Sequence, residues 1–184
     1  MHPADVAEHV AASVEVLRER LSERPELGAG TAVLEDDVRL YIPFTVRVRQ
    51  MVDTAVPSSL LGPGGVNLAF GARVVLLGAP PEERALLLAM DLTDYDAQPP
   101  TAELLLPDRS PLPATQWPKS LDGQGVVPGH RDYDRLWFCR RGLREYHTHH
   151  EHEDDPWDRH REGLALHSVV EELLHEFSTR FIGN

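Results

Sequence analysis

The stretch TAVLEDDVRLYIPFTVRVRQ, residues 31–50, decides the fold class of this chain. Residues with β-branched and aromatic side chains stand on both sides of Glu35, Asp36 and Asp37. Such runs are typical of strands, and a short polar cluster between them is typical of a turn. The stretch therefore predicts an antiparallel hairpin.

The segment before the hairpin has a helical pattern. Apolar residues recur there at steps of three and four, with charged residues between them, which predicts an amphipathic helix over residues 4–23. After the hairpin, the apolar runs RVVLLG (73–78), RALLLAMDL (84–92) and TAELLLPD (101–108) predict further strands, although a short helix stays open for the second of these runs.

The helical period returns near the end of the chain, from Leu164 to Phe177, and predicts a closing helix over residues 157–182. We expect a single α+β domain over residues 1–184, with a mainly antiparallel sheet of about four strands flanked by N-terminal and C-terminal helices. Its parts are the helix 4–23, the sheet 31–108, a Pro/Gly loop with a Cys/His segment over 109–156, and the closing helix.

Composition narrows the class of protein. A chain of 184 residues with 41% hydrophobic residues can bury one core. The 18 basic and 30 acidic residues give a net charge of -12, which argues against nucleic acid as a partner. No apolar run approaches the roughly 18 residues that span a bilayer, and no targeting segment is recognised, so we expect a cytoplasmic protein without a membrane partner. The single cysteine, Cys139, excludes an intrachain disulfide.

Residues 137–157, WFCRRGLREYHTHHEHEDDPW, carry the chemistry. Cysteine, histidine and carboxylate side chains are the ligands of zinc and of similar divalent metals. The segment predicts a divalent metal site, most suited to zinc. Its candidate ligands are Cys139, Glu145, His147, His149 and His152.

Two local geometries are open for this segment. An extended chain turns Glu145, His147 and His149 to one face, whereas a helix brings together Glu145, His149 and His152. The aromatic and β-branched residues between the histidines favour the extended form. Both forms keep Glu145 and His149 together.

Gly142 offers a bend that folds Cys139 back toward the histidines. We expect the Cys139 thiol within about 4 Å of an imidazole nitrogen of His147 or His149. Nearby arginines favour the thiolate, which a metal ligand and a nucleophile both require. These arginines are Arg140, Arg141 and Arg144.

Simpler interpretations stand beside the metal site. An acidic, histidine-rich stretch can be a solvated loop, and a cysteine beside aromatic residues can be a buried apolar residue. Helical spacing favours a surface or packing role for His160, His167 and His175, and His130 is a weaker ligand candidate. The aspartates around Pro156 are explained as a turn and a helix cap. They are Asp154, Asp155 and Asp158.

The set Cys139, Glu145, His147 and His149 resembles the predicted metal-binding family named for its Cys-Glu-His-His residues, which is associated with bacterial ubiquitin-like conjugation systems. The order of elements is similar to the ubiquitin-conjugating-enzyme (UBC) fold: a first helix, a meander, Tyr95 before a Pro-Pro pair, a strand, a loop bearing a cysteine, and a later helix. The resemblance implies that the four residues bind a metal, with Glu145 as fourth ligand or as general base.

The leading hypothesis is a metal-binding accessory protein of such a pathway, with a ubiquitin-like protein or its activating enzyme as partner. An open metal position would make it a hydrolase, with Glu145 as the base. The first alternative is a conjugating enzyme, a transferase that forms a thioester on Cys139. The second is a metal-free interaction module. The sequence lacks the His-Pro-Asn tripeptide of conjugating enzymes, so the asparagine that supports their oxyanion is missing.

Overall fold

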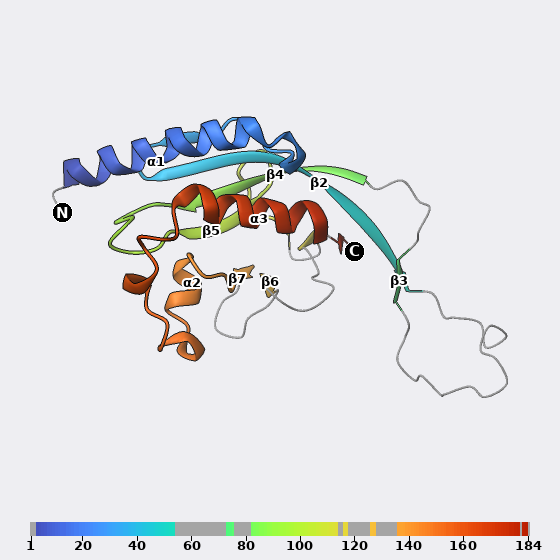
Figure 1. The fold of residues 1–184 in the computed structure, drawn as a ribbon. Coiled ribbons are helices and arrows are strands. Elements are labelled where there is room, and N and C mark those ends of the chain that lie inside the picture. The colour runs from blue at the N-terminus through green and yellow to red at the C-terminus, as the bar shows by residue number, and fades with distance from the viewer. Residues whose placement is uncertain are drawn as a thin grey trace, which may run out of the picture.

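The computed structural model gives the arrangement of most of the chain (Figure 1). It describes residues 3–53, 73–75, 82–113, 116–117, 126–127, 136–180 and 182–183. The helices are α1 (Pro3–Glu23), α2 (Arg144–His147) and α3 (Leu166–Arg180), with short 3-10 turns at Pro25–Leu27, His150–His152 and Trp157–Arg159. The strands are β1 (Val33–Glu35), β2 (Arg39–Asp53), β3 (Arg73–Val75), β4 (Glu82–Asp91), β5 (Thr101–Leu105), β6 (Val126–Val127), β7 (Trp137–Phe138) and β8 (Ile182–Gly183).

The main sheet is an antiparallel meander in the order β1-β2-β4-β5. Its register places Tyr41 of β2 opposite Ala89 of β4, which in turn lies opposite Glu103 of β5. The far end of β2 also pairs with β3, antiparallel, and with β8, parallel. The predicted α+β class, with an antiparallel sheet between N-terminal and C-terminal helices, is therefore confirmed.

The predicted hairpin between β1 and β2 is present. Three residues separate β1 from β2, and the backbone N–H of Val38 donates to the Glu35 carbonyl at 3.2 Å. Asp36 and Asp37, the central residues of this β-turn, both have positive φ angles, of 50° and 59°. Aspartate tolerates this conformation better than most residues because its short side chain can hydrogen-bond locally. The run 84–92, for which a short helix was open, lies in β4, a strand.

One face of the sheet carries the core. Alternate residues of β2, from Leu40 to Val48, are buried, and the residues between them are partly or fully exposed. Phe177 of α3 stacks on Phe44 of β2 and contacts the edge of Phe138 of β7, so α3 lies between the sheet and β7. α1 contacts α3 and adds its own apolar face to the same core. The α1 residues in that core are Val10, Val14, Leu17 and Leu21.

The closing helix begins later than expected. The predicted range 157–182 contains a 3-10 turn at Trp157–Arg159 and a further turn, and α3 starts at Leu166. Trp157 is buried, and its indole N–H donates to the backbone carbonyl of Asp96 at 2.9 Å. This tertiary bond outweighs the local helical pattern. Much of the predicted loop after residue 113, His130 included, lies outside the described residues.

Candidate functional site

Cys139 follows β7 and is held on α3 by its two neighbours. Phe138, before it, is fully buried against Phe177, with ring centroids 5.8 Å apart. Arg140, after it, donates from Nε to Oε2 of the buried Glu176 at 2.8 Å. Cys139 itself is half-buried. Its backbone is therefore fixed by one apolar contact and one charged contact with the same helix.

Gly142 makes the bend that the sequence predicts. Its φ of +94° lies in the region that favours glycine, and a Cβ at this position would stand 2.6 Å from Cγ2 of Val169 on α3. After the bend, Leu143 enters the core. The chain thus reverses on the surface of α3 and returns toward Cys139.

The histidine segment is helical at its start, so the expected extended form is wrong. Arg144 begins one turn of helix, and both its backbone N–H and its Nε donate to carbonyls of the Pro99-Pro100 pair, at 2.8 and 3.1 Å. The hydroxyl of Thr148 donates back to the Arg144 carbonyl at 2.8 Å. These bonds outweigh the strand propensity of the residues. His149 is then extended, and a 3-10 turn follows.

This path brings the Cys139 thiol against an imidazole. Sγ lies 3.3 Å from Nε2 of His152, a distance typical of a hydrogen bond that involves sulfur. The sequence places this contact on His147 or His149, whereas in the structure His152 makes it. The ring of His152 stacks on Tyr146, with centroids 3.9 Å apart and planes at 14°.

His147 has a different role from the one expected. The backbone N–H of Gly142 donates to its Nε2 at 3.2 Å, so the proton is assigned to Nδ1, which donates to the Asp155 carbonyl at 2.8 Å. Burial lowers the pKa of His147, which favours this neutral form. Both ring nitrogens of His147 therefore hold the backbone of the site.

The remaining predicted ligands are Glu145 and His149. Glu145 is buried, with 4% of its surface exposed, and the His149 ring centroid is 5.7 Å from that of His152. Nδ1 of His149 is 3.9 Å from a carboxylate oxygen of Glu151. Across the described part of the chain, no three or more Cys, His, Asp or Glu side chains are grouped so that they could hold a metal ion. Among the predicted ligands, Cys139 and His152 bring a sulfur and a nitrogen within 3.3 Å of each other.

Asp155 is the residue of the site that sequence reasoning missed. Its place before Pro156 predicts a role in a turn and helix cap, but the 3-10 turn that follows has no side-chain cap bond. Its carboxylate instead accepts hydrogen bonds from the Tyr146 hydroxyl at 3.0 Å, from Arg141 Nε at 3.0 Å, and from His160. These partners, His160 first, lower the pKa of Asp155 to about 2. No periodicity links residues 141, 155 and 160, so this network could not be predicted from a local pattern.

The thiol is not activated by the arginines around it. Burial, and then the negative charge of Glu151, raise the pKa of Cys139, where the sequence predicted a lower value. The three arginines are engaged elsewhere: Arg140 with α3, Arg141 with the network just described, and Arg144 with backbone carbonyls. Their charges therefore stabilise the fold and leave the thiol protonated at neutral pH.

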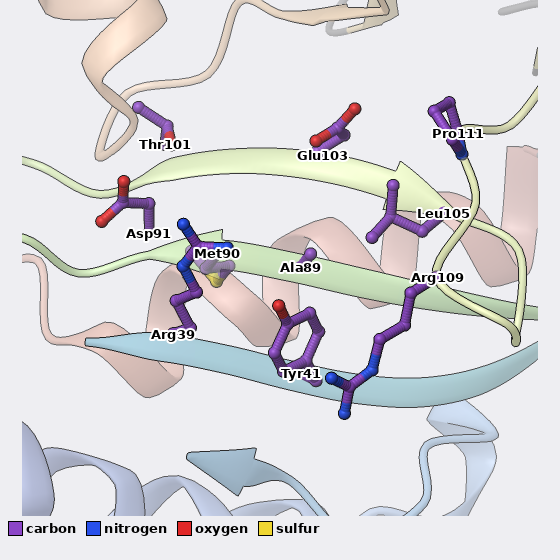
Figure 2. Close-up of a pocket in the computed structure, with 10 residues that line it drawn as sticks. All are labelled: Arg39, Tyr41, Ala89, Met90, Asp91, Thr101, Glu103, Leu105, Arg109 and Pro111. Carbon is purple, nitrogen blue, oxygen red and sulfur yellow. The ribbon is translucent and has the colours of Figure 1, made fainter. Parts of the chain in front are cut away.

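A pocket of about 510 Å³ lies on the other face of the sheet, away from the core (Figure 2). Side chains of β2, β4 and β5 line it, together with the loop after β5. The guanidinium of Arg109 lies 4.4 Å from the ring centroid of Tyr41 and is also bonded to Glu35. None of the predicted site residues lines this pocket.

The described residues thus form an α+β protein with a half-buried thiol–imidazole pair on the segment after the sheet. Comparison of the chain with protein-family models and with curated proteins finds no match. No helix within the described ranges has the length and apolar character that a bilayer crossing needs. Function is therefore inferred from the chemistry of the pair and from the order of the elements.

Proposed function

We propose that this chain is a UBC-like protein of a ubiquitin-like conjugation pathway, in which Cys139 accepts the C-terminal acyl group of a ubiquitin-like protein as a thioester. The observation that carries the proposal is the 3.3 Å contact between Cys139 Sγ and His152 Nε2. A thiol nucleophile beside an imidazole base is a recurrent arrangement for acyl transfer.

The order of elements supports the UBC-like part of the proposal. A first helix, the meander β1-β2-β4-β5 and the buried Tyr95 before Pro99 and Pro100 precede the cysteine, as in that fold. The Pro-Pro segment is bonded to the residue that begins α2, five residues after Cys139. The segment carrying the cysteine is therefore attached to the connection between β4 and β5.

The chemistry follows from the state of the thiol. Because the pKa of Cys139 is raised, the thiol needs a base, and Nε2 of His152 accepts its proton as sulfur attacks the activated carbonyl carbon. The new C–S bond forms as the bond to the leaving thiolate of the activating enzyme breaks. The imidazolium then returns the proton to that thiolate, so no net charge or electron is gained.

A divalent metal site is the second candidate, in the accessory protein that the sequence favoured. The 3.3 Å separation supports it, because a sulfur and a nitrogen bound to one tetrahedral zinc lie about 3.5 Å apart. His147 is bonded to backbone through both nitrogens, so further ligands would have to come from the other predicted residues, Glu145 and His149. As placed, the described residues do not complete a set of three, and we derive no step through a metal.

One experiment separates the two functions. The purified full chain is incubated with a short peptide ending in a Gly-Gly thioester, and the adduct is measured by intact mass. Cys139 is the only cysteine, so an adduct that excess free thiol removes by thioester exchange reports this residue alone. We expect the wild type to form an adduct and Cys139→Ala to form none. The rate of adduct formation should fall at least about tenfold in His152→Ala. The exposed neighbour His150 gives the matched control, His150→Ala, which we expect to react like the wild type.

The zinc content of the same preparations tests the second candidate, the divalent metal site. Stoichiometric zinc, lost in both Cys139→Ala and His152→Ala, together with an unreactive thiol, would support the accessory metal protein and reject thioester formation. A metal-free chain that reacts with the peptide would reject the metal site.

A further inference from the structure

The thioester chemistry leaves one network unused, the hydrogen bonds that meet at Asp155. They join residues that are 5 and 14 positions apart from Asp155 in the sequence, and they lie directly beside the thiol–imidazole pair. Such a network has either a purely structural role or a role in setting the geometry of the pair. The contacts of Tyr146 distinguish between the two.

Tyr146 connects the network to the base. One face of its ring stacks on the His152 imidazole at a centroid distance of 3.9 Å, and its hydroxyl donates to Oδ2 of Asp155 at 3.0 Å. The tyrosine is thus fixed at both ends, by the α2 backbone and by the carboxylate. A ring fixed in this way offers His152 one plane on which to lie.

Asp155 is itself held in place. Arg141 Nε donates to the same carboxylate oxygen that accepts the tyrosine hydroxyl, and His160 bonds to the other oxygen. The backbone carbonyl of Asp155 accepts from His147, so main chain and side chain are both fixed. With a pKa of about 2, Asp155 stays ionised across the pH range in which an imidazole titrates.

We propose that Tyr146 and Asp155 are positioning residues that hold the His152 imidazole against the Cys139 thiol. Tyr146 holds the imidazole through the ring stack, and Asp155 acts through the tyrosine hydroxyl. The inference rests on the proposed function only in that His152 serves as the base for Cys139. It predicts that both residues affect the thiol through His152 and not directly.

The test is the rate of Cys139 alkylation by iodoacetamide in the full chain, measured from pH 6 to pH 10. Tyr146→Leu removes the stack, and we expect its pH–rate profile to match that of His152→Ala. Tyr146→Phe keeps the ring and loses the hydroxyl bond, and we expect a rate about two- to tenfold below wild type, above that of the leucine variant. Asp155→Asn should resemble Tyr146→Phe. His150→Ala is again the matched control.

A double variant decides whether Tyr146 acts through His152. In the His152→Ala background, Tyr146→Leu should cause no further loss of rate, because the base it positions is gone. An equal loss in both backgrounds would overturn the proposal and make Tyr146 a general structural residue. If His152→Ala is slow but Tyr146→Leu reacts like wild type, the positioning role alone fails. If His152→Ala reacts like wild type, His152 is not the base for Cys139, and the proposed function itself is rejected.

Discussion

Gly142→Ala tests whether the bend behind Cys139 is held as the structure describes. Two independent costs follow from the geometry. Alanine at a φ of +94° is strained, by about 1 to 2 kcal/mol for the left-handed region. The added Cβ also stands 2.6 Å from Cγ2 of the buried Val169, and relief of such overpacking costs about 1 to 3 kcal/mol. We expect the free energy of unfolding to fall by about 2 to 5 kcal/mol.

The two costs can be separated by a double-mutant cycle. Val169→Ala removes the methyl group that the new Cβ meets, so Gly142→Ala in that background should cost only the backbone strain, about 1 to 2 kcal/mol. The difference between the two backgrounds measures the steric cost. Urea unfolding followed by far-UV circular dichroism gives each free energy.

The matched control is Gly163→Ala. A Cβ at Gly163 would meet its nearest neighbour, the His160 carbonyl oxygen, at 3.7 Å, an ordinary contact, and no positive φ is required there. We expect this variant to lie within about 0.5 kcal/mol of wild type. A Gly142→Ala chain as stable as the control would refute the bend, and a loss undiminished by Val169→Ala would refute the steric part of the reasoning.

Three further predictions concern single groups. Burial lowers the pKa of His147, so as the pH drops below about 6.5 its imidazole takes up a proton in the unfolded chain before it does so in the folded chain, and stability falls. In urea titrations, His147→Gln should therefore lose less stability than the wild type between about pH 6.5 and 5. Burial raises the pKa of Tyr95 to about 12, so the stability that its neutral hydroxyl contributes is present below pH 10 and is lost between pH 10 and 12. In thermal melts, the melting temperature of Tyr95→Phe should therefore fall less than that of the wild type over this pH range. Glu176→Gln removes the charge that pairs with Arg140, whose side chain is one-third exposed, and should lower the free energy of unfolding by about 1 to 2 kcal/mol in urea titrations. If Glu176→Gln causes an equal loss of stability in an Arg140→Ala background, the pairing is contradicted.

Much of the fold could be predicted because its signals are local. The heptad-like spacing from Val10 to Leu21 defined α1 to within one residue at its start, and the two aspartates at positions 36 and 37 marked a turn that few other residues adopt. The start of α3 could not be predicted in this way. Trp157 stands at the start of the predicted helix, but its indole N–H bonds to the carbonyl of Asp96, 61 residues away, and a local pattern does not contain that partner.

The sequence predicted which residue types make up the site, but it did not predict which of them are in contact. Cys139 and the histidines were singled out because of their chemistry, yet the partner of the thiol is His152, 13 residues away and beyond two changes of backbone conformation. The prediction of a lowered pKa for Cys139 was also wrong, for a physical reason. Arginine charge lowers a thiol pKa only where it is directed at the thiol, and each of these arginines is bonded to another group.

The thiol–imidazole pair depends on contacts made far from the cysteine. The connection between β4 and β5, which contains Asp96 and Pro100, accepts hydrogen bonds from Trp157 and from Arg144. Both ends of the stretch from residue 144 to residue 157 are therefore attached to this connection. α3 holds the other side, through the contacts of the residues that flank Cys139. Contacts with three separate elements thus hold the spacing of the pair. This preorganisation is what a base must have to act on a thiol whose pKa is raised, because the proton is transferred only within hydrogen-bond distance.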